Sequence, residues 1–487
     1  MGDERMREGC GVYGVHLKRG EALPYLYWGL LAQNHRGHQS HGFAVYDGGI
    51  KVFKELGLIP PISHLSSKPE IGELSGGVGI GNVRYATSGA CDEASLRRDA
   101  MPISISERGK SVAISLNGNI VNLKDLRGEF GNGGSDVHVI CRILLEGIRE
   151  TGSLEEGVKG CMERAEGAFS ITGLTDEGTL FAFKDPYGFK PLCYGRGDGV
   201  EAFSSESVGL DINGIERVGE VQPGELLVVD GSSVHREQLV PCRRRAFCAF
   251  EFAYFARPDS IFDERYVYEV RRRFGVNLAS RYSETASRCD IVISLPETSN
   301  DAAYGFHEES GLPWEMATRR HRYVTQRAFI MGAEERRNIV YRKVNILKPK
   351  IAGKRIAVVD DSIVRGDTTR SAVKRLREAG AKEIHLFITF PRIIGPCFYG
   401  IDMATYEELI GARLTPEKIA EELGADSVNY QPLEDYVEAT GMRMNDLCLG
   451  CVTGEYPTPT ANRLAKETRE RISRGEREHG RIYETPD

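Results

Sequence analysis

The chain has 487 residues, of which 41% are hydrophobic and 27% are charged, and its formal net charge at pH 7 is -7. The length predicts more than one domain of ordinary globular composition. The negative charge argues against nucleic acid or an anionic membrane as a partner, and no apolar run reaches membrane-spanning length. Eleven cysteines and no apolar leader in the first residues predict a cytoplasmic protein with free, catalytic or metal-bound thiols.

The first half of the chain reads as an α+β domain of short, mainly antiparallel strands. A helix is predicted from Asp136 to at least Glu146, with Val139, Ile140, Ile143 and Leu144 on one face and Ser135 or Asp136 as its cap. Near Val240–Arg245 the pattern changes to longer helices and strand–helix–strand units, so we place a domain boundary at 240/241. The tail from 458 to 487 is highly charged and predicts a peripheral helix or partial disorder. The strands expected in the first half are Val12–Val15, Gly42–Tyr46, Val78–Ala86, Val112–Leu116, Phe169–Gly173 and Leu180–Lys184.

Candidate catalytic residues of the first half lie in five short motifs. Cys10 stands in a Gly-Cys-Gly sequence near the start of a strand, where a cysteine is usually a small hydrophobic residue. Each of the other motifs is also weak by itself, because an Asn-Gly-Asn turn is common and a lone arginine is usually a surface charge. These motifs are Asn34–Gly42, Asn82–Thr87, Asn117–Ile120 and Ser135–Asp136.

Taken in this order, the motifs resemble those of the N-terminal-nucleophile (class II) glutaminases, over roughly Cys10 to Glu225. The resemblance implies an αββα sandwich over residues 10–240, preceded by a propeptide of residues 1–9. Cys10 would attack the glutamine amide with its own freed α-amino group as base, which suits the usual pKa of such an amine. Asn117 and Gly118 would form the oxyanion hole. The implied glutamine-binding residues are Arg36, Gly37, Arg84, Thr87 and Asp136.

A strand, a short loop and a helix carry the main motif of the second half. The apolar run Ile356–Val359 ends in Asp360 and Asp361, and a loop with Gly366 and two threonines leads into a helix. Ligands of parallel sheets lie beyond the carboxyl ends of the strands, and a helix N-terminus favours an anion. Adjacent carboxylates accept hydrogen bonds from neighbouring hydroxyls, so the stretch predicts a sugar-phosphate site. A metal-binding acid pair or a plain turn are the alternatives.

The amino-acid sequence of this loop resembles that of type I phosphoribosyltransferases, and of the glutamine phosphoribosyl pyrophosphate (PRPP) amidotransferases in particular. The resemblance extends to near Pro457, through the stretches Ala249–Ser260 and Leu295–Ser299, and implies an α/β phosphoribosyltransferase domain with a parallel sheet over residues 241–457. It also implies a Mg2+ ion at Ser299, Asp360 and Asp361, and a basic loop, Arg320–Ile330, that closes over PRPP. Asp367 stands where the family usually has threonine. The implied PRPP-binding residues are Asp360, Asp361, Arg365, Gly366, Asp367, Thr368, Thr369, Arg322 and Arg327.

Four cysteines form a further candidate site. Cys448 and Cys451 form a CxxC motif, which by itself fits redox chemistry, zinc or half of a cluster site. Within the resemblance, these two and Cys248 and Cys397 fall where one subgroup of the family binds a [4Fe–4S] cluster. We therefore expect one cluster per chain, with zinc at the same thiolates as the alternative.

The resemblance implies an amidophosphoribosyltransferase that hydrolyses glutamine and transfers the ammonia to C1 of PRPP, giving 5-phosphoribosylamine, glutamate and pyrophosphate. This is the first step of de novo purine synthesis. The rival hypothesis is a regulatory protein of the same fold that senses PRPP or nucleotides without catalysis. The expected partners are glutamine, PRPP and purine nucleotides as feedback inhibitors, with no nucleic acid and no membrane, in a homo-oligomer.

Overall fold

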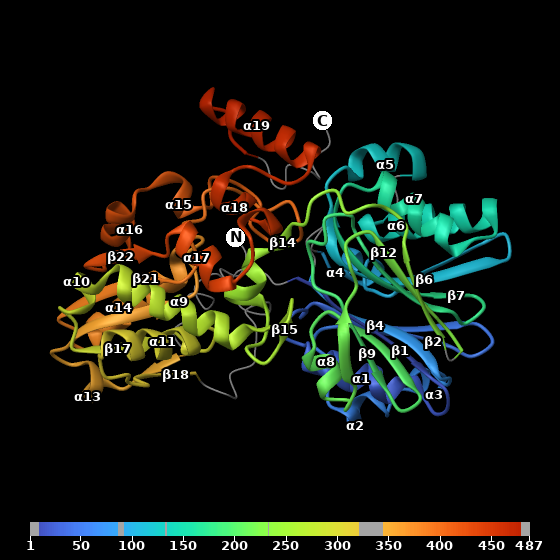
Figure 1. The fold of residues 1–487 in the computed structure, drawn as a ribbon, viewed down its shortest axis with the longest axis horizontal. Coiled ribbons are helices and arrows are strands. Elements are labelled where there is room, and N and C mark those ends of the chain that lie inside the picture. The colour runs from blue at the N-terminus through green and yellow to red at the C-terminus, as the bar shows by residue number, and fades with distance from the viewer. Residues whose placement is uncertain (1–8, 86–91, 132–133, 232, 321–343, 479–487) are drawn as a thin grey trace.

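The structure is a computed structural model that describes residues 9–85, 92–131, 134–231, 233–320 and 344–478. Figure 1 shows two halves side by side, with the N-terminal half in blue to green and the C-terminal half in yellow to red. Within the described ranges, no helix is long and apolar enough to cross a membrane.

Two antiparallel sheets packed face to face form the N-terminal half. The first sheet has the strand order β11-β9-β10-β1-β4-β2-β3. Side chains alternate along β1, so that Val12 joins the core between the sheets while Tyr13 and Val15 pack beneath helix α1 (Ala22–Ala32). The strands are β1 (Gly11–Leu17), β2 (Ser40–Tyr46), β3 (Ile50–Leu56), β4 (Val78–Arg84), β9 (Cys193–Gly197), β10 (Val200–Ser204) and β11 (Glu216–Glu220). Short helices flank this sheet: α2 (Ile62–Leu65), α3 (Pro69–Gly72), α4 (Glu93–Arg98) and α8 (Val208–Asp211).

The second sheet has the order β13-β12-β8-β7-β6-β5, and helices cover its outer face. Helix α6 buries Val139, Ile140, Ile143 and Leu144 against it, which is the face expected from their spacing. The layers are therefore α–β–β–α, which confirms the predicted sandwich. The strands are β5 (Ile103–Glu107), β6 (Lys110–Ile120), β7 (Gly167–Thr175), β8 (Leu180–Lys184), β12 (Glu225–Asp230) and β13 (Ser233–Gln238). The helices are α5 (Leu123–Phe130), α6 (Asp136–Thr151) and α7 (Leu154–Arg164).

A parallel sheet forms the centre of the C-terminal half, in the order β17-β20-β21-β22. Its strands are apolar on both faces, because helices cover both. Helices α9 and α11 cover one face, and α14 and α16 the other. The strands are β17 (Ile291–Ser294), β20 (Arg355–Asp360), β21 (Glu383–Ile388) and β22 (Ser427–Tyr430). The helices are α9 (Val267–Arg281), α10 (Ser283–Ala286), α11 (Asn300–Ser310), α13 (Lys348–Ile351), α14 (Asp367–Glu378), α15 (Ile410–Arg413), α16 (Pro416–Leu423) and α17 (Leu433–Thr440).

Short elements build the junction between the halves. The predicted boundary at 240/241 falls between β13 and β14, where the antiparallel sheets have ended. A continuous apolar core crosses the junction, and the rings of Phe189 and Tyr399 stack in it at 4.1 Å. The elements at the junction and the edge are β14 (Phe247–Cys248), the π-helix η1 (Glu251–Phe255), β15 (Ile261–Phe262), β16 (Arg265–Tyr266), β18 (Thr318–Arg320), β19 (Val344–Ile346), η3 (Met444–Asp446), β23 (Leu447–Cys448) and α18 (Gly450–Thr453).

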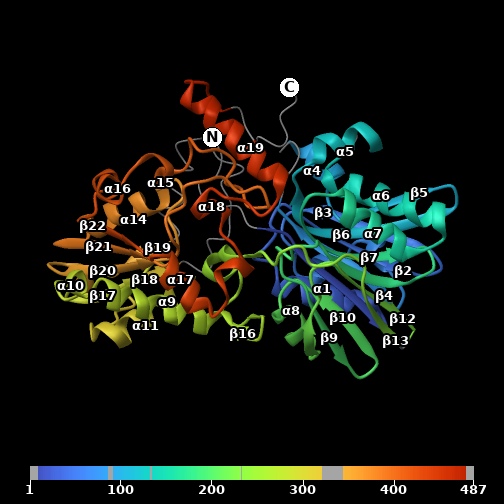
Figure 2. The same cartoon turned by 45° about the horizontal axis from the view of Figure 1, so that its top comes forward.

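The last described helix, α19 (Pro459–Ser473), lies over the junction in both views (Figures 1 and 2). At its start, the backbone N–H and the hydroxyl of Thr460 donate to the carboxylate of Glu166 at 2.6 and 2.9 Å. Glu166 belongs to the N-terminal half, so the described part of the charged tail contains a helix, Pro459–Ser473, whose beginning is anchored across the junction.

Candidate functional site

The first predicted site gathers around Cys10, which is buried directly before β1. Its thiol donates to the carbonyl oxygen of Tyr85 at 3.5 Å. Strand β4, paired with β1, ends at Arg84, and α6 begins at Asp136. Burial raises the pKa of the Cys10 thiol, while the positive charge of Arg84 opposes the rise and the negative charge of Asp136 adds to it. The sheet pairing and the helix start therefore bring three of the predicted residues together.

Asn117 lies on β6 opposite Ser170 and is fully buried. In the part of the chain that the structure describes, neither polar atom of its side chain has a hydrogen-bond partner. A buried amide without a partner is costly and indicates a ligand. A Cβ placed on Gly9 would lie 3.4 Å from Oδ1 of Asn117, so this amide faces the peptide that precedes the nucleophile.

Gly118 follows Asn117 with a positive φ of 152°, and a Cβ there would lie 1.9 Å from the carbonyl oxygen of Ala168. Only glycine fits this position. The loop after β21 closes this side of the site: the side chain of Asn119 donates to the carbonyl of Phe398 at 2.9 Å, and a Cβ on Gly400 would lie 3.1 Å from the carbonyl of Gly118. The predicted oxyanion hole therefore has a wall supplied by the C-terminal half.

Arg36 also lies beside Cys10, but its guanidinium contacts the protein itself. Its Nε donates to the carbonyl oxygen of Cys10 at 3.1 Å, and its Nη atoms donate to Glu206 and Glu251. The neighbouring Gly37 packs against the end of β4, where a Cβ would lie 2.4 Å from the backbone nitrogen of Arg84. A contact between Arg36 and glutamine stays a prediction, and Thr87 lies outside the described residues.

The second predicted site lies at the carboxyl end of the parallel sheet. Asp360 ends β20 and Asp361 follows it, and both are buried. The turn after the adjacent β17 reaches them: Thr298 Oγ1 donates to Asp361 Oδ2 at 2.6 Å, and Ser299 Oγ donates to Asp360 Oδ1 at 3.4 Å. Burial and the charge of Asp361 raise the pKa of Asp360 well above its ordinary value, and burial also raises the pKa of Asp361. Two carboxylates that are costly to ionise together suit hydroxyl donors or a cation.

The loop after Asp361 runs into α14 as predicted. Gly366 has a φ of +89° and is the N-cap, and the buried Thr369 lies in the first turn with Thr368. Asp367 begins the helix, and its Oδ1 accepts a 2.6 Å hydrogen bond from Nη1 of Arg370. This ion pair partly offsets the negative charge of Asp367 beside the expected phosphate.

The structure does not place three of the predicted PRPP-binding arginines at the expected phosphate site. Arg365 Nε donates to Glu408 Oε2 at 2.8 Å, so its guanidinium is engaged by a carboxylate. Arg322 and Arg327 lie outside the described residues, as does most of the basic loop. Their contacts with PRPP stay predictions.

The four predicted cluster cysteines come together at the junction. Cys248 and Cys448 are register partners in the parallel pair β14–β23, and the carbonyl of Cys451 accepts from Ile394 and Gly395 in the loop that leads to Cys397. Burial raises the pKa of the Cys451 thiol, and the other three thiols raise it further. All four are free thiols. Across the described ranges, no three cysteine, histidine or acidic side chains converge tightly enough for a single metal ion.

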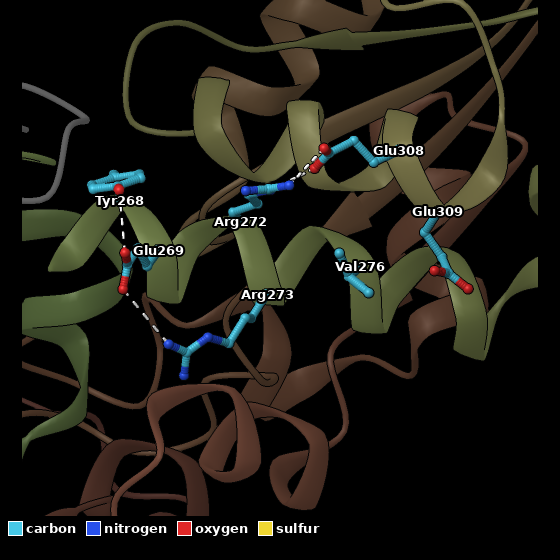
Figure 3. Close-up of a pocket in the computed structure, with 7 residues that line it drawn as sticks. All are labelled: Tyr268, Glu269, Arg272, Arg273, Val276, Glu308 and Glu309. Atoms are coloured by element: carbon cyan, nitrogen blue, oxygen red, sulfur yellow. Dashed lines mark hydrogen bonds and ion pairs between the residues drawn. The ribbon is translucent and has the colours of Figure 1, made fainter. Parts of the chain in front are cut away.

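A separate hollow of about 430 Å³ opens between α9 and α11 on the outer face of the C-terminal half (Figure 3). Arg272 pairs with Glu308 at 2.5 Å and Arg273 with Glu269 at 3.8 Å, so both arginines of the hollow are engaged by carboxylates. None of the predicted site residues lines it. The lining residues are Tyr268, Glu269, Arg272, Arg273, Val276, Glu308 and Glu309.

Sequence reasoning missed Glu206, Glu251, Thr298 and Arg271. Arg271 is buried in α9 and donates to the carbonyls of Phe252 and Ala256. Glu251 and Thr298 stood inside the quoted stretches Ala249–Ser260 and Leu295–Ser299. No local sequence pattern indicates that a charged or hydroxyl side chain will be buried. The contacts of these four residues are therefore visible only in the folded structure.

Comparisons with known proteins show what the chain is similar to. A family model described as a glutamine amidotransferase domain matches residues 93–211. The chain is 37% identical over 477 residues to the amidophosphoribosyltransferase of Methanothermobacter thermautotrophicus, covering 96% of this chain and 98% of that protein. It is 38% identical over 473 residues to that of Methanocaldococcus jannaschii, covering 92% and 98%. It is also similar to the solved structure of glutamine PRPP amidotransferase from B. subtilis, complexed with ADP and GMP, with 33% identity, a TM-score of 0.83, and coverage of 93% and 98%.

Proposed function

Since the chain belongs to the amidophosphoribosyltransferase family, we propose that its two sites carry the two halves of that reaction. The enzyme hydrolyses glutamine and transfers the ammonia to C1 of PRPP, giving 5-phosphoribosylamine, glutamate and pyrophosphate. The observation that carries the assignment is the buried amide of Asn117, which has no partner among the described residues and faces the peptide just before Cys10, with Arg84 and Asp136 from two further elements acting on the same thiol.

At the first site, Cys10 is the nucleophile that attacks the glutamine side-chain amide. Because burial raises the pKa of its thiol, the thiol needs a base, and the α-amino group freed by removal of residues 1–9 supplies one. Arg84 binds the substrate carboxylate and Asp136 its ammonium group. The Asn117 side chain and the Gly118 N–H stabilise the oxyanion that forms on attack.

At the second site, Asp360 and Asp361 accept hydrogen bonds from the ribose hydroxyls. Backbone N–H groups of residues 365–369, with Thr368 and Thr369, hold the 5′-phosphate at the start of α14, where the helix dipole favours an anion. Ammonia then displaces pyrophosphate from C1. Ser299, Asp360 and Asp361 would hold Mg2+, which supplies charge neutralisation of the leaving pyrophosphate.

We propose that Cys248, Cys397, Cys448 and Cys451 hold one [4Fe–4S] cluster. Support comes from four free thiols, of which only that of Cys451 belongs to a partly exposed residue, that gather from β14, β23, α18 and the loop after β21. The cluster would cross-link these segments. A regulatory role for purine nucleotides is likewise a proposal, since the B. subtilis structure is of a complex with ADP and GMP. A homo-oligomeric state and a cytoplasmic location stay predictions.

The reaction is tested by pyrophosphate release from PRPP, with glutamine and with ammonia as the nitrogen source. We expect release with both. Cys10→Ser should abolish release with glutamine and spare release with ammonia, because the thiol acts only in the first half-reaction. Release with neither source would support the non-catalytic sensor instead.

A further inference from the structure

Four charged side chains form a buried network between the halves. Arg36 donates to Glu206 at 2.6 Å and to both oxygens of Glu251 at 2.8 and 2.9 Å. Lys190 completes the network, with its Nζ 3.4 Å from Glu251 Oε1. The side chains of Glu206, Glu251 and Lys190 are 0% exposed and that of Arg36 is 1% exposed. These four groups are two positive and two negative, and the partly exposed imidazole of His35 also contacts the network, with its Nε2 2.8 Å from Glu206 Oε1.

The network ends on the nucleophile, because the remaining guanidinium nitrogen of Arg36, Nε, donates to the carbonyl oxygen of Cys10 at 3.1 Å. A planar guanidinium held by two carboxylates has little freedom to rotate. It therefore fixes the carbonyl group of Cys10, and with it the backbone that carries the thiol and the α-amino group.

The carboxylates that hold Arg36 depend on the C-terminal half. Glu251 is the first residue of the π-helix η1 in that half. Glu206 belongs to the N-terminal half, but its second oxygen accepts from the Arg257 N–H at 2.9 Å and the Ser260 hydroxyl at 2.6 Å, both in the C-terminal half. A π-helical turn is rare and often marks a functional position.

We propose that Glu251 is a positioning residue for the glutaminase reaction: a side chain of the phosphoribosyltransferase half fixes the catalytic cysteine of the other half through Arg36. Glu251 contacts neither substrate in this role. The proposal rests on the function proposed above, since it assigns the glutaminase reaction to Cys10.

The test is Glu251→Gln in the full-length enzyme, which keeps the shape of the side chain and removes its charge. We expect kcat with glutamine to fall roughly tenfold to a hundredfold, because small misplacement of a reacting group costs up to about a hundredfold. KM for glutamine should stay within about twofold, since Arg84 and Asp136 are untouched. The rate with ammonia should be unchanged. Alkylation of Cys10 by iodoacetamide, followed on the Cys10 peptide by mass spectrometry, should slow in parallel with kcat.

Glu308→Gln is the matched control. It removes the charge of an exposed glutamate of α11 that pairs with Arg272 of α9, outside both proposed sites. It should change neither rate. If Glu251→Gln does not fold, Glu251→Asp replaces it, because aspartate keeps the charge and withdraws the carboxylate by one methylene. This variant should likewise lower kcat with glutamine and leave KM for glutamine within about twofold.

Three outcomes overturn the proposal: unchanged kcat with glutamine, a rise in KM with kcat unchanged, or an equal loss with glutamine and ammonia, which would mark a purely structural role. Failure of the proposed function is distinguishable from these. In that case the wild-type enzyme itself would show no glutamine hydrolysis.

Discussion

Thr298 donates a 2.6 Å hydrogen bond to Asp361, although 63 residues separate them in the chain. Strands β17 and β20 are neighbours in the parallel sheet, so the turns at their carboxyl ends meet. The Thr298 hydroxyl orients Oδ2 of Asp361, while the Ser362 hydroxyl donates to Oδ1 at 2.6 Å, and burial raises the pKa of this carboxylate. This relationship links the Leu295–Ser299 turn to the predicted PRPP site.

Asp361→Ala should lower the use of PRPP. It removes the proposed acceptor for the ribose hydroxyls, and losing a hydrogen bond to a charged group costs about 1.5–3 kcal/mol. The expected loss in kcat/KM for PRPP is roughly tenfold to a hundredfold. Pyrophosphate release should fall equally with ammonia and with glutamine, because binding of PRPP precedes the choice of nitrogen source.

Basal glutamine hydrolysis provides the control for Asp361→Ala, because it takes place at Cys10 in the other half. It should persist in the variant. If the variant loses basal hydrolysis and keeps ammonia-dependent synthesis, the two sites have been assigned to the wrong halves.

The active chain should begin at Cys10. The α-amino group can serve as base only after residues 1–9 have been removed. Intact mass spectrometry of active enzyme should show the loss of Met1–Gly9. Full glutaminase activity in a chain that still carries these residues would refute the assignment of the base.

The four junction cysteines should bind iron and sulfide. Anaerobically purified enzyme should be brown and contain about four iron and four sulfide per chain. Cys448→Ser should lower the iron content and the melting temperature, because the proposed cluster would join β14, β23, α18 and the loop after β21. Cys161→Ser, at a buried cysteine in the core of the N-terminal half, is the matched control and should keep the iron. Colourless protein with one zinc per chain would identify the alternative metal.

Stability should fall below pH 6.5 because of His138. Its Nδ1 accepts from the backbone N–H of Ser135 at 3.2 Å and so caps α6, the helix that begins with Asp136. Burial lowers the pKa of His138 from 6.5 to about 4. Between these values the unfolded chain binds a proton and the folded chain does not, so folding loses stability as the pH falls.

His138→Gln should remove this pH dependence, because glutamine keeps an acceptor and does not titrate. The free energy of unfolding is measured by denaturant titration at pH 7.5 and at pH 5. The decrease between the two pH values should be about 2 kcal/mol smaller in the variant than in the wild type. His64→Gln, at an exposed histidine of α2, should keep the wild-type difference. An equal difference in wild type and His138→Gln would show that His138 is not responsible.

Asp367→Thr should strengthen PRPP binding. Asp367 begins α14, and its pairing with Arg370 offsets only part of its charge beside the expected 5′-phosphate. Removing one like charge at this partly exposed site is worth about 1 kcal/mol, or about a fivefold lower KM for PRPP. An acid also stabilises a helix N-terminus, so the variant should lose about 0.3–1 kcal/mol of stability. An unchanged KM would show that Asp367 does not face the phosphate.

The sequence allowed prediction of features that depend on short-range patterns. The spacing of Val139, Ile140, Ile143 and Leu144 predicted the buried face of α6, and the run Ile356–Val359 predicted a buried parallel strand. Both are confirmed, because local periodicity follows directly from which face of an element is buried. The αββα and α/β architecture came from the family resemblance, and the structure confirms it.

Other features depend on contacts between distant parts of the chain. Arg36 was expected at the glutamine pocket, but its guanidinium pairs with Glu206 and Glu251, which are 170 and 215 residues away in sequence. Burying such charges is favourable only when all partners are in place. No single segment carries that information, so the network could not be read from the motifs.

The anchoring of α19 has a consequence for the connectivity of the molecule. The chain leaves the N-terminal half after β13, builds the other half, and returns at Thr460 to Glu166 of the first. The halves are thus connected by the polypeptide chain after β13 and by the hydrogen bonds between Thr460 and Glu166, which form a hydrogen-bonded latch at the start of α19. A protease cut between Val240 and Phe247 would open the covalent link and leave the latch and the apolar junction in place. The two fragments would then remain together as a nicked but assembled enzyme.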